Sequence, residues 1–265
     1  MTCRLLSKTL QFTPMKTPRP NLSDMAAAAG VPGVAEHATE PAAPARLLVK
    51  VCGMRDAAAL AQVAALGPDF LGFIFAPRSP RFVGEALAPE LVQALPPGIW
   101  KVGVFVNETT ENILVVAKRF GLAAVQLHGQ ETAAQCEELS EAGLLVIKAF
   151  SVGQVVDFAA LLPYVPHCDF FLFDTKGAAP GGNGAIFDWN LLSAYNLPVP
   201  YFLAGGLGLE HAAELAALRL PGLVGVDLNS GFETAPGVKD AGRLGEMLAA
   251  LTLRNELKQC NENVK

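Results

Sequence analysis

The feature that most constrains the fold is an eightfold alternation of short apolar runs with longer amphipathic segments, which begins at Leu47. The apolar runs are nearly continuous and of strand length, which is typical of parallel strands covered on both faces. Strands that alternate with helices indicate βαβ units. Eight such units in roughly 205 residues predict an α/β fold, a single-domain (β/α)8 TIM barrel. The alternative is an open doubly wound sheet, but no GxGxxG turn follows the first strand.

The expected elements follow from this pattern and from local capping signals. The expected strands are 47–53, 70–76, 101–107, 123–128, 144–149, 170–175, 201–205 and 223–229. The expected helices are 56–65, 89–94, 110–120, 131–142, 155–162, 189–194, 210–218 and 241–253, with Asp56, Thr110 and Asp188 as candidate N-caps.

Residues 1–45 lack a sustained apolar period and are rich in Pro, Ala, Thr and Ser, so we expect a disordered N-terminal extension. Residues 46–265 are the expected barrel domain. Basic residues precede the first acid, Asp24, which is also the composition of an organelle transit peptide. We favour the alternative of an over-long start, with Met15 or Met25 as the true initiator.

Composition argues against several classes of protein. The net charge is -5 and no cluster of Lys and Arg stands out, so we expect no nucleic-acid partner. The longest apolar runs fall well short of the roughly 20 residues that a membrane span needs. The cysteines are odd in number, scattered and without CxxC spacing, which argues against a disulfide framework or a zinc site and favours a reducing, cytoplasmic location. They are Cys3, Cys52, Cys136, Cys168 and Cys260. The four histidines are equally dispersed, so no metal centre is expected.

Polar or reactive residues close nearly every expected strand. In a (β/α)8 barrel the C-terminal ends of the strands meet at one mouth, where the chemistry lies. These side chains should therefore converge. They are Cys52, Arg78 with Arg81, Asn107, Gln126 with His128, Lys148, Asp174, Gly205 with Gly206, and Asp227 with residues 229–231.

Cys52 and Asp174 are the candidate acid–base pair. A lone Cys in a strand is usually an inert apolar residue. Cys52, however, ends the first strand beside Gly53, and the nearby charges of Lys50 and Arg55 can lower a thiol pKa so that the thiolate acts as a general base. Asp174 follows a run of four apolar residues, so a partly buried carboxyl group there is suited to donate a proton. A capping or ion-paired role for this carboxylate is equally compatible.

Small residues end strands seven and eight, at 205–206 and 229–231. They leave backbone N–H groups free to face an anion, and barrels commonly bind phosphate at this place. Arg78 and Arg81 could hold a planar carboxylate through two hydrogen bonds. The Gly-rich segment 177–184 is either a lid over the site or a flexible connection.

Together these motifs resemble one family, phosphoribosylanthranilate isomerase of tryptophan biosynthesis. The ordered set covers about residues 47–253. The matching segments are Lys50-Val-Cys-Gly53, Gly72-Phe-Ile-Phe75 with Ser79-Pro-Arg81, Val102-Gly-Val-Phe-Val-Asn107, Val125-Gln-Leu-His-Gly129, Phe173-Asp-Thr-Lys176 with Gly181-Gly-Asn-Gly184 and Phe187-Asp-Trp189, Leu203-Ala-Gly-Gly-Leu207, and Val226-Asp-Leu-Asn-Ser-Gly231.

The resemblance implies a cofactor-free Amadori rearrangement by a monofunctional enzyme, present as a monomer or homodimer. N-(5'-phosphoribosyl)anthranilate would become 1-(2-carboxyphenylamino)-1-deoxyribulose 5-phosphate. It implies that Cys52 is the general base, that Asp174 is the general acid, and that Arg81 holds the anthranilate carboxylate. The other substrate-binding residues would be His128 and Asp227, with Gly205, Gly206, Asn229, Ser230 and Gly231 at the phosphate. Many relatives have two serines where this chain has Asn229-Ser230, which leaves open whether the Asn229 side chain contacts the phosphate.

Three alternatives are compatible with a barrel of this kind. Indole-glycerol phosphate synthase needs a catalytic lysine at the mouth, for which Lys50 or Lys148 are candidates. A ribulose-phosphate epimerase needs metal ligands, which the dispersed histidines do not supply. The third alternative is a catalytically silent barrel that only binds a phosphosugar.

Overall fold

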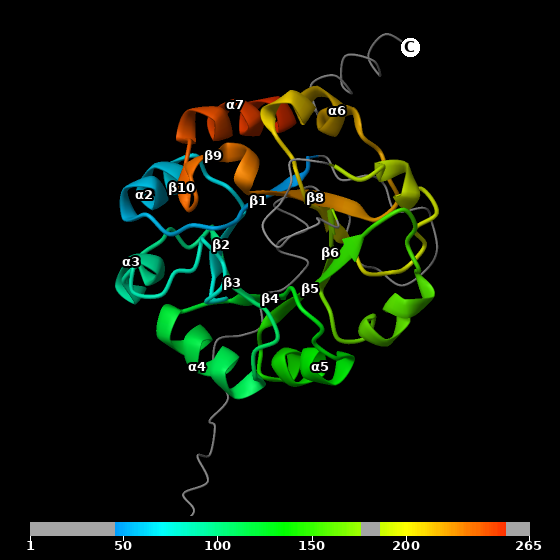
Figure 1. Ribbon diagram of the computed structural model, residues 1–265, viewed down its shortest axis with the longest axis horizontal. Coiled ribbons are helices and arrows are strands. Elements are labelled where there is room, and N and C mark those ends of the chain that lie inside the picture. Colours follow the sequence, from blue (N-terminus) through cyan, green and yellow to red (C-terminus); the bar gives the residue numbers. More distant parts are fainter. Residues whose placement is uncertain (1–45, 176–185, 253–265) are drawn as a thin grey trace, which may run out of the picture.

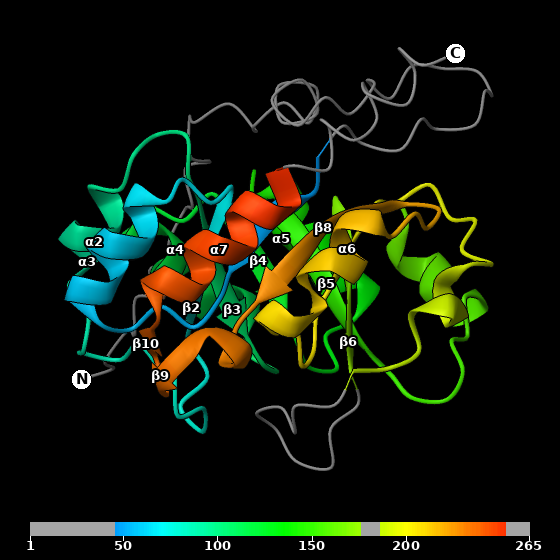
Figure 2. The ribbon, with the colours of Figure 1, turned by 90° about the horizontal axis from the view of Figure 1, so that it is seen from above.

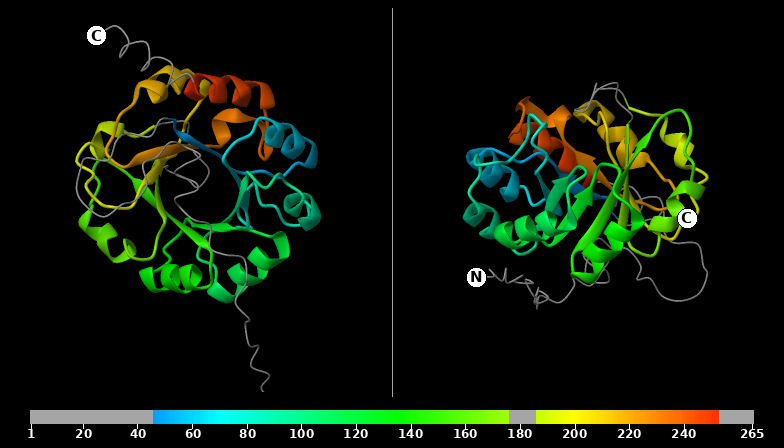
Figure 3. Two further views of the ribbon diagram at one scale, coloured as in Figure 1. Left: turned by 180° about the vertical axis from the view of Figure 1, so that it is seen from behind. Right: turned by 60° about the horizontal axis from the view of Figure 1, so that its bottom comes forward.

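The computed structural model describes residues 46–175 and 186–252, in which eight parallel strands close into a barrel in the order β1 to β8. This confirms the predicted (β/α)8 fold over the open sheet. Helices surround the strands, as seen from either end of the barrel (Figures 1 and 3). The strands are β1 Leu48–Val51, β2 Phe70–Ile74, β3 Trp100–Phe105, β4 Ala124–Leu127, β5 Leu145–Val152, β6 Phe170–Thr175, β7 Tyr201–Leu203 and β8 Leu223–Leu228.

The helices follow the expected order, with differences at their ends. The α-helices are α2 Ala57–Ala65, α3 Pro89–Gln93, α4 Thr110–Phe120, α5 Ala133–Glu141, α6 Ala212–Ala217 and α7 Ala241–Thr252, and the 3-10 helices are η1 Ala159–Tyr164, η2 Trp189–Leu192, η3 Leu209–His211 and η4 Ser230–Phe232. Asp56 caps α2 as predicted, since its carboxylate accepts from the Ala59 N–H at 2.8 Å. The cap of α4 is Thr109 and not Thr110. None of these helices is long and apolar enough to cross a membrane.

Several segments differ from the sequence-based expectation. The expected helix 189–194 is the 3-10 helix η2, and the expected helix 210–218 begins as the 3-10 helix η3. The expected helix 155–162 is the short 3-10 helix η1, which contains Pro163, and proline lacks the N–H that an α-helix would use. Helix α5 begins two residues later than expected because Thr132 caps it, which releases Glu131 for another role. An unpredicted hairpin, β9 Glu233–Ala235 and β10 Val238–Lys239, lies beyond the arrowhead of β8 (Figure 2). The predicted N-terminal extension and the Gly-rich segment fall outside the described residues.

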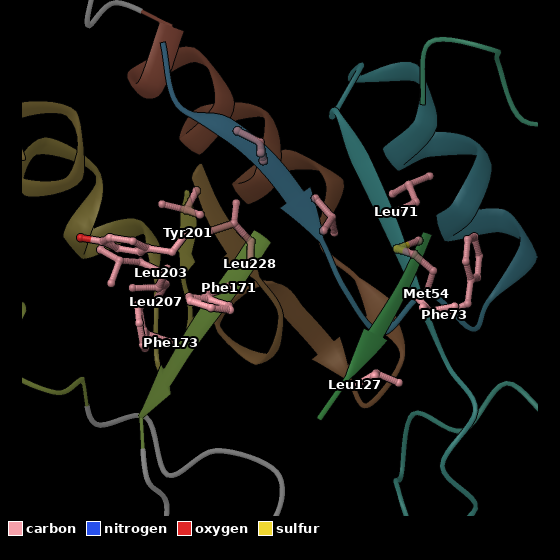
Figure 4. Packing of buried hydrophobic residues seen from close by; sticks show 14 of the residues in the cluster. Met54, Leu71, Phe73, Leu127, Phe171, Phe173, Tyr201, Leu203, Leu207 and Leu228 are labelled. Carbon is pink, nitrogen blue, oxygen red and sulfur yellow. The ribbon is translucent and has the colours of Figure 1, made fainter. Parts of the chain in front are cut away.

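The core has two layers because successive strand side chains point to opposite faces. In β1, Leu48 packs with the cluster inside the barrel, whereas Val49 and Val51 belong to the cluster between strands and helices. Figure 4 shows part of this outer cluster, with Phe173 and Tyr201 close together at β6 and β7. The same alternation directs Cys52 inward, onto the face of β1 that Leu48 shares.

The inner layer predicts a large cost for removing one aromatic ring. Phe202 is fully buried and meets Phe70 and Phe170 with centroids 5.4 and 5.3 Å apart. Because a cavity would remain at the barrel's base, Phe202→Ala should lower the free energy of unfolding by about 3–5 kcal/mol, measured by urea titration. The exposed Val115→Ala in α4 is the control and should change it by about 0.5 kcal/mol or less. A small effect at Phe202 would show that this ring does not hold the core.

Candidate active site

A buried ion pair lies at the seam where the barrel closes. Lys50 of β1 and Asp227 of β8 are register partners, and Lys50 Nζ lies 2.8 Å from Asp227 Oδ2. Burial would lower the pKa of the ammonium, but the charges of Asp227 and Cys52 outweigh it, so the Lys50 pKa is raised. Burial raises the Asp227 pKa, and the charge of Lys50 opposes the rise. Asp227 Oδ1 has no hydrogen-bond partner within residues 46–175 and 186–252, so this oxygen is available to a ligand.

Cys52 lies beside this pair, and the charges of both Lys50 and Asp227 act on its thiol. A Cβ at Gly72 would lie only 2.8 Å from the Cys52 sulfur, so the thiol needs glycine on β2 to occupy its position. Burial raises the thiol pKa, and although Lys50 and Lys239 lower it, they do not reverse the rise. The expectation that neighbouring positive charge would favour the thiolate is therefore wrong, because desolvation is the larger effect on the Cys52 pKa.

Asp174, at the end of β6, is held by His128 from the end of β4. His128 Nε2 lies 3.2 Å from Asp174 Oδ2, and each side chain is 29% exposed, which leaves both open to the mouth. On the other side of the ring, the Gln126 amide nitrogen lies 2.8 Å from His128 Nδ1. Since the amide nitrogen can only donate, Nδ1 accepts this bond and the neutral ring carries its hydrogen on Nε2. The Nε2–H group then donates a hydrogen bond to the carboxylate. A Cβ at Gly205 would come within 2.5 Å of Asp174 Oδ1, so the loop after β7 must carry a glycine here.

The predicted carboxylate-binding Arg81 is already engaged by an acid. Its Nε lies 2.9 Å from both carboxylate oxygens of Glu233, and its Nη2 lies 2.6 Å from one of them. Burial would raise the Glu233 pKa, but Arg81 and Lys239 hold it below its usual value, so this acid is ionised at neutral pH. Arg78 is exposed, and among the described residues no hydrogen bond or ion pair of its side chain joins it to this group.

The loops after β7 and β8 are where the sequence predicts an anion site. Gly205 and Gly206 have φ of 86° and 68°, a region that favours glycine. The backbone N–H groups of these glycines and of Ser230 and Gly231 have no partner among the residues described. Gly231 packs directly against the Leu207 carbonyl, which joins the two loops. Four N–H groups are thus available to a phosphate.

The Asn229 side chain points to a different partner from the one the resemblance suggests. Its Oδ1 accepts from Lys239 Nζ at 2.8 Å, and its backbone carbonyl accepts from the same ammonium at 3.2 Å. Asn229 therefore connects the loop after β8 to the β9–β10 hairpin through its oxygens.

Sequence reasoning missed the buried acids that hold the mouth in place. Glu131, expected to begin a helix, instead accepts from the N–H groups of Asn107 and Gly129 at 2.8 Å and fixes the loops after β3 and β4. Its charge is balanced by Lys148 at 3.1 Å. Lys148 shares its strand face with Val146 of the outer cluster, so it does not lie at the mouth. Periodicity carries no signal for such acids, because their partners are distant in sequence.

Comparison with known proteins shows which family this chain and fold are similar to. A family model described as N-(5'phosphoribosyl)anthranilate (PRA) isomerase matches residues 49–250. The N-(5'-phosphoribosyl)anthranilate isomerase of Phocaeicola vulgatus is 45% identical over 80% of this chain and 98% of its own length. Phosphoribosyl anthranilate isomerase from Thermotoga maritima has a TM-score of 0.69 and 35% identity, covering 79% of this chain and 98% of that one. A further isomerase structure, in complex with reduced 1-(o-carboxyphenylamino)-1-deoxyribulose 5-phosphate, has a TM-score of 0.66 and 34% identity over 78% of this chain and 98% of that one.

The charges around Cys52 predict opposite effects of two substitutions. Lys50 lowers the thiol pKa and Asp227 raises it. Lys50→Met should therefore raise the pKa and reduce the thiolate fraction at a given pH, whereas Asp227→Asn should lower the pKa and increase that fraction. Ultraviolet thiolate absorbance, titrated against pH, measures both. Subtracting the titration curve of the Cys52→Ser variant removes the absorbance of the other cysteines. Shifts in the same direction for the two variants would contradict this electrostatic account.

Proposed function

The chain belongs to the N-(5'-phosphoribosyl)anthranilate isomerase family, and from that premise we propose how its barrel mouth performs the reaction. The protein is an isomerase of tryptophan biosynthesis that converts N-(5'-phosphoribosyl)anthranilate to 1-(2-carboxyphenylamino)-1-deoxyribulose 5-phosphate. The observation that carries the proposed roles is the placement of a thiol on β1 and a carboxyl group on β6, each supported by neighbours from other strands.

Asp174 is the general acid in this proposal. It protonates the furanose ring oxygen while the bond from that oxygen to C1 breaks, and the nitrogen lone pair forms the C1=N bond of a Schiff base. His128 donates to Oδ2, which leaves Oδ1 as the oxygen that carries the transferred proton. His128 is thus proposed to orient the acid as well as to line the substrate site.

Cys52 is the general base. Its thiolate removes the proton from C2, and the electrons of that C–H bond form the C1=C2 bond as the C=N pair returns to nitrogen. The resulting enolamine tautomerises to the ketone. The positive charge of Lys50 stabilises the thiolate before the proton is taken.

Two anion sites and one acceptor hold the substrate between acid and base. We place the phosphate on the free N–H groups of Gly205, Gly206, Ser230 and Gly231. We place the anthranilate carboxylate on Arg81. The unpartnered Asp227 Oδ1 is suited to accept from the amine N–H of the anthranilate. The Asn229 contribution to the phosphate is limited to its backbone position, since Lys239 holds its side-chain oxygen.

The two alternative enzymes, indole-glycerol phosphate synthase and a ribulose-phosphate epimerase, lack a supporting observation. Lys148, one of two lysines available to a synthase, is bonded to Glu131 between the sheet and α5. The other, Lys50, is bonded to Asp227. Within the described ranges no three His, Cys, Asp or Glu side chains are grouped to hold a metal ion.

The wider setting is proposed on sequence grounds. We propose a monofunctional enzyme that uses no cofactor and takes a small phosphosugar–anthranilate substrate, with neither nucleic acid nor membrane as a partner. A monomer or a homodimer is compatible with the family pattern. The cytoplasm is the proposed location. The domain limits at 45 and 46 remain a prediction.

Turnover of the two catalytic variants tests the proposal. With phosphoribosylanthranilate generated in situ, the loss of anthranilate-type fluorescence reports conversion. Cys52→Ser and Asp174→Asn should each reduce kcat by at least about a hundredfold, the scale of acid–base groups. The matched controls are Cys136→Ser, buried in α5 away from the mouth, and the exposed Asp157→Asn, both expected to retain turnover. Near-normal turnover in either catalytic variant would remove that residue from the mechanism, and failure of the wild-type gene to rescue a tryptophan auxotroph lacking this step would overturn the function.

A further inference from the structure

Two buried ions in the unpredicted hairpin neither give nor take a proton in the proposed mechanism. Glu233 opens β9 and Lys239 closes β10, and the two are register partners across the hairpin. Lys239 Nζ lies 2.7 Å from Glu233 Oε1, and the side chains are 0% and 5% exposed, respectively. Burying two charges carries a desolvation cost, which is repaid only by good pairing geometry and by further hydrogen bonds. The other groups that this pair contacts are therefore informative.

The pair holds Arg81 by one edge of its guanidinium. Glu233 accepts from Nε and from Nη2, which is the side edge of the planar group. Nη1 has no hydrogen-bond partner among the described residues, and Nη2 has a second hydrogen to donate. The end edge, formed by Nη1 and Nη2, is therefore the edge left for a second carboxylate.

The hairpin ions are themselves anchored at the mouth. Lys239 also donates to both oxygens of Asn229, at the start of the phosphate loop. A Cβ at Gly53, the residue after Cys52, would lie 2.7 Å from Asn229 Oδ1, 2.8 Å from Arg81 Cδ and 3.4 Å from Lys239 Nζ. The group thus packs around the backbone next to the catalytic thiol, where a rotation of the guanidinium has little room.

We propose that Glu233, anchored by Lys239, is a positioning residue that fixes Arg81 with its Nη1–Nη2 edge toward the anthranilate carboxylate. The inference rests on the proposed function, because it takes Arg81 as the partner of that carboxylate. Arg81 and Lys239 carry two positive charges and Glu233 one negative charge, so the cluster keeps one net positive charge for the substrate to neutralise. Without the Glu233 charge, the two cations repel each other and the guanidinium is no longer held by its side edge.

A competing role for Glu233 makes the opposite prediction. If this acid only competed with the substrate for Arg81, neutralising it would release the guanidinium and tighten binding of a carboxylate ligand. If it positions Arg81, neutralising it weakens the binding of that ligand and spares a ligand without the carboxylate.

Two ligands that differ by one carboxylate separate these roles. One is reduced 1-(o-carboxyphenylamino)-1-deoxyribulose 5-phosphate, and the other is the same compound made from aniline, which lacks the carboxylate. Calorimetry gives the affinity of the full-length protein for each ligand. The readout is the affinity for the carboxylate ligand divided by the affinity for the ligand made from aniline. We expect Glu233→Gln to lower this ratio about tenfold, the worth of one well-placed charged hydrogen bond. Lys239→Met should lower it in the same direction, and the exposed Glu141→Gln in α5 should leave it unchanged.

Arg81→Met separates failure of the inference from failure of the proposed function. This variant should abolish the preference for the carboxylate ligand. If it does not, the proposed role of Arg81 fails. If it does, but Glu233→Gln leaves the ratio unchanged or raises it, the positioning role is overturned. Equal loss of affinity for both ligands in both hairpin variants, including loss through misfolding, would assign the pair a structural role alone and would also overturn the inference.

Discussion

The Lys50–Asp227 ion pair is the interaction on which the rest of the mouth depends. It joins the first and last strands, so the contact that closes the barrel also sets the charge beside the Cys52 thiol. Breaking a buried pair by removing one partner typically costs about 3–5 kcal/mol, because the remaining charge is left unpaired. The pair is therefore tolerable only while both strands stay in register. Because β1 closes against β8 at this point, the position of Cys52 is coupled to that of the loop after β8, the proposed phosphate site.

Buried lysine–acid ion pairs also lie beneath other loops of the mouth. Lys148 balances Glu131, whose carboxylate ties the loops after β3 and β4 and so fixes the turn that follows His128. Lys239 balances Glu233 beside Arg81. In each case a buried lysine neutralises an acid from a different element, and the acid holds functional groups through directed hydrogen bonds. Charge-assisted bonds of this kind are short and directional, which suits them to hold loops that have little regular structure of their own.

The barrel was predictable because its signals are local. Apolar runs and their spacing predicted all eight strands, and strand ends predicted that Cys52, His128 and Asp174 would share one mouth. The ion pairs were not predictable, since Glu233 reaches Arg81 across 152 residues of sequence and only the closed fold brings them together. The hairpin was missed because β9 and β10 have three and two residues, too few to show a period. The sign of the Cys52 pKa shift was missed because nearby charges can be read from sequence, whereas the depth of burial cannot.

The raised pKa of Cys52 has a chemical consequence for its proposed role as the general base. A thiol whose pKa is raised by burial has a smaller ionised fraction at neutral pH, but each thiolate is a stronger base toward the C2 proton. Lys50 and Lys239 recover part of the ionised fraction, while Asp227 opposes them. A third cation against the sulfur would increase the thiolate population further and weaken its basicity. The charge on Arg81 is instead paired with Glu233. In the proposed mechanism, Arg81 can therefore bind the substrate carboxylate near Cys52 with less loss of the basicity that the proton transfer requires.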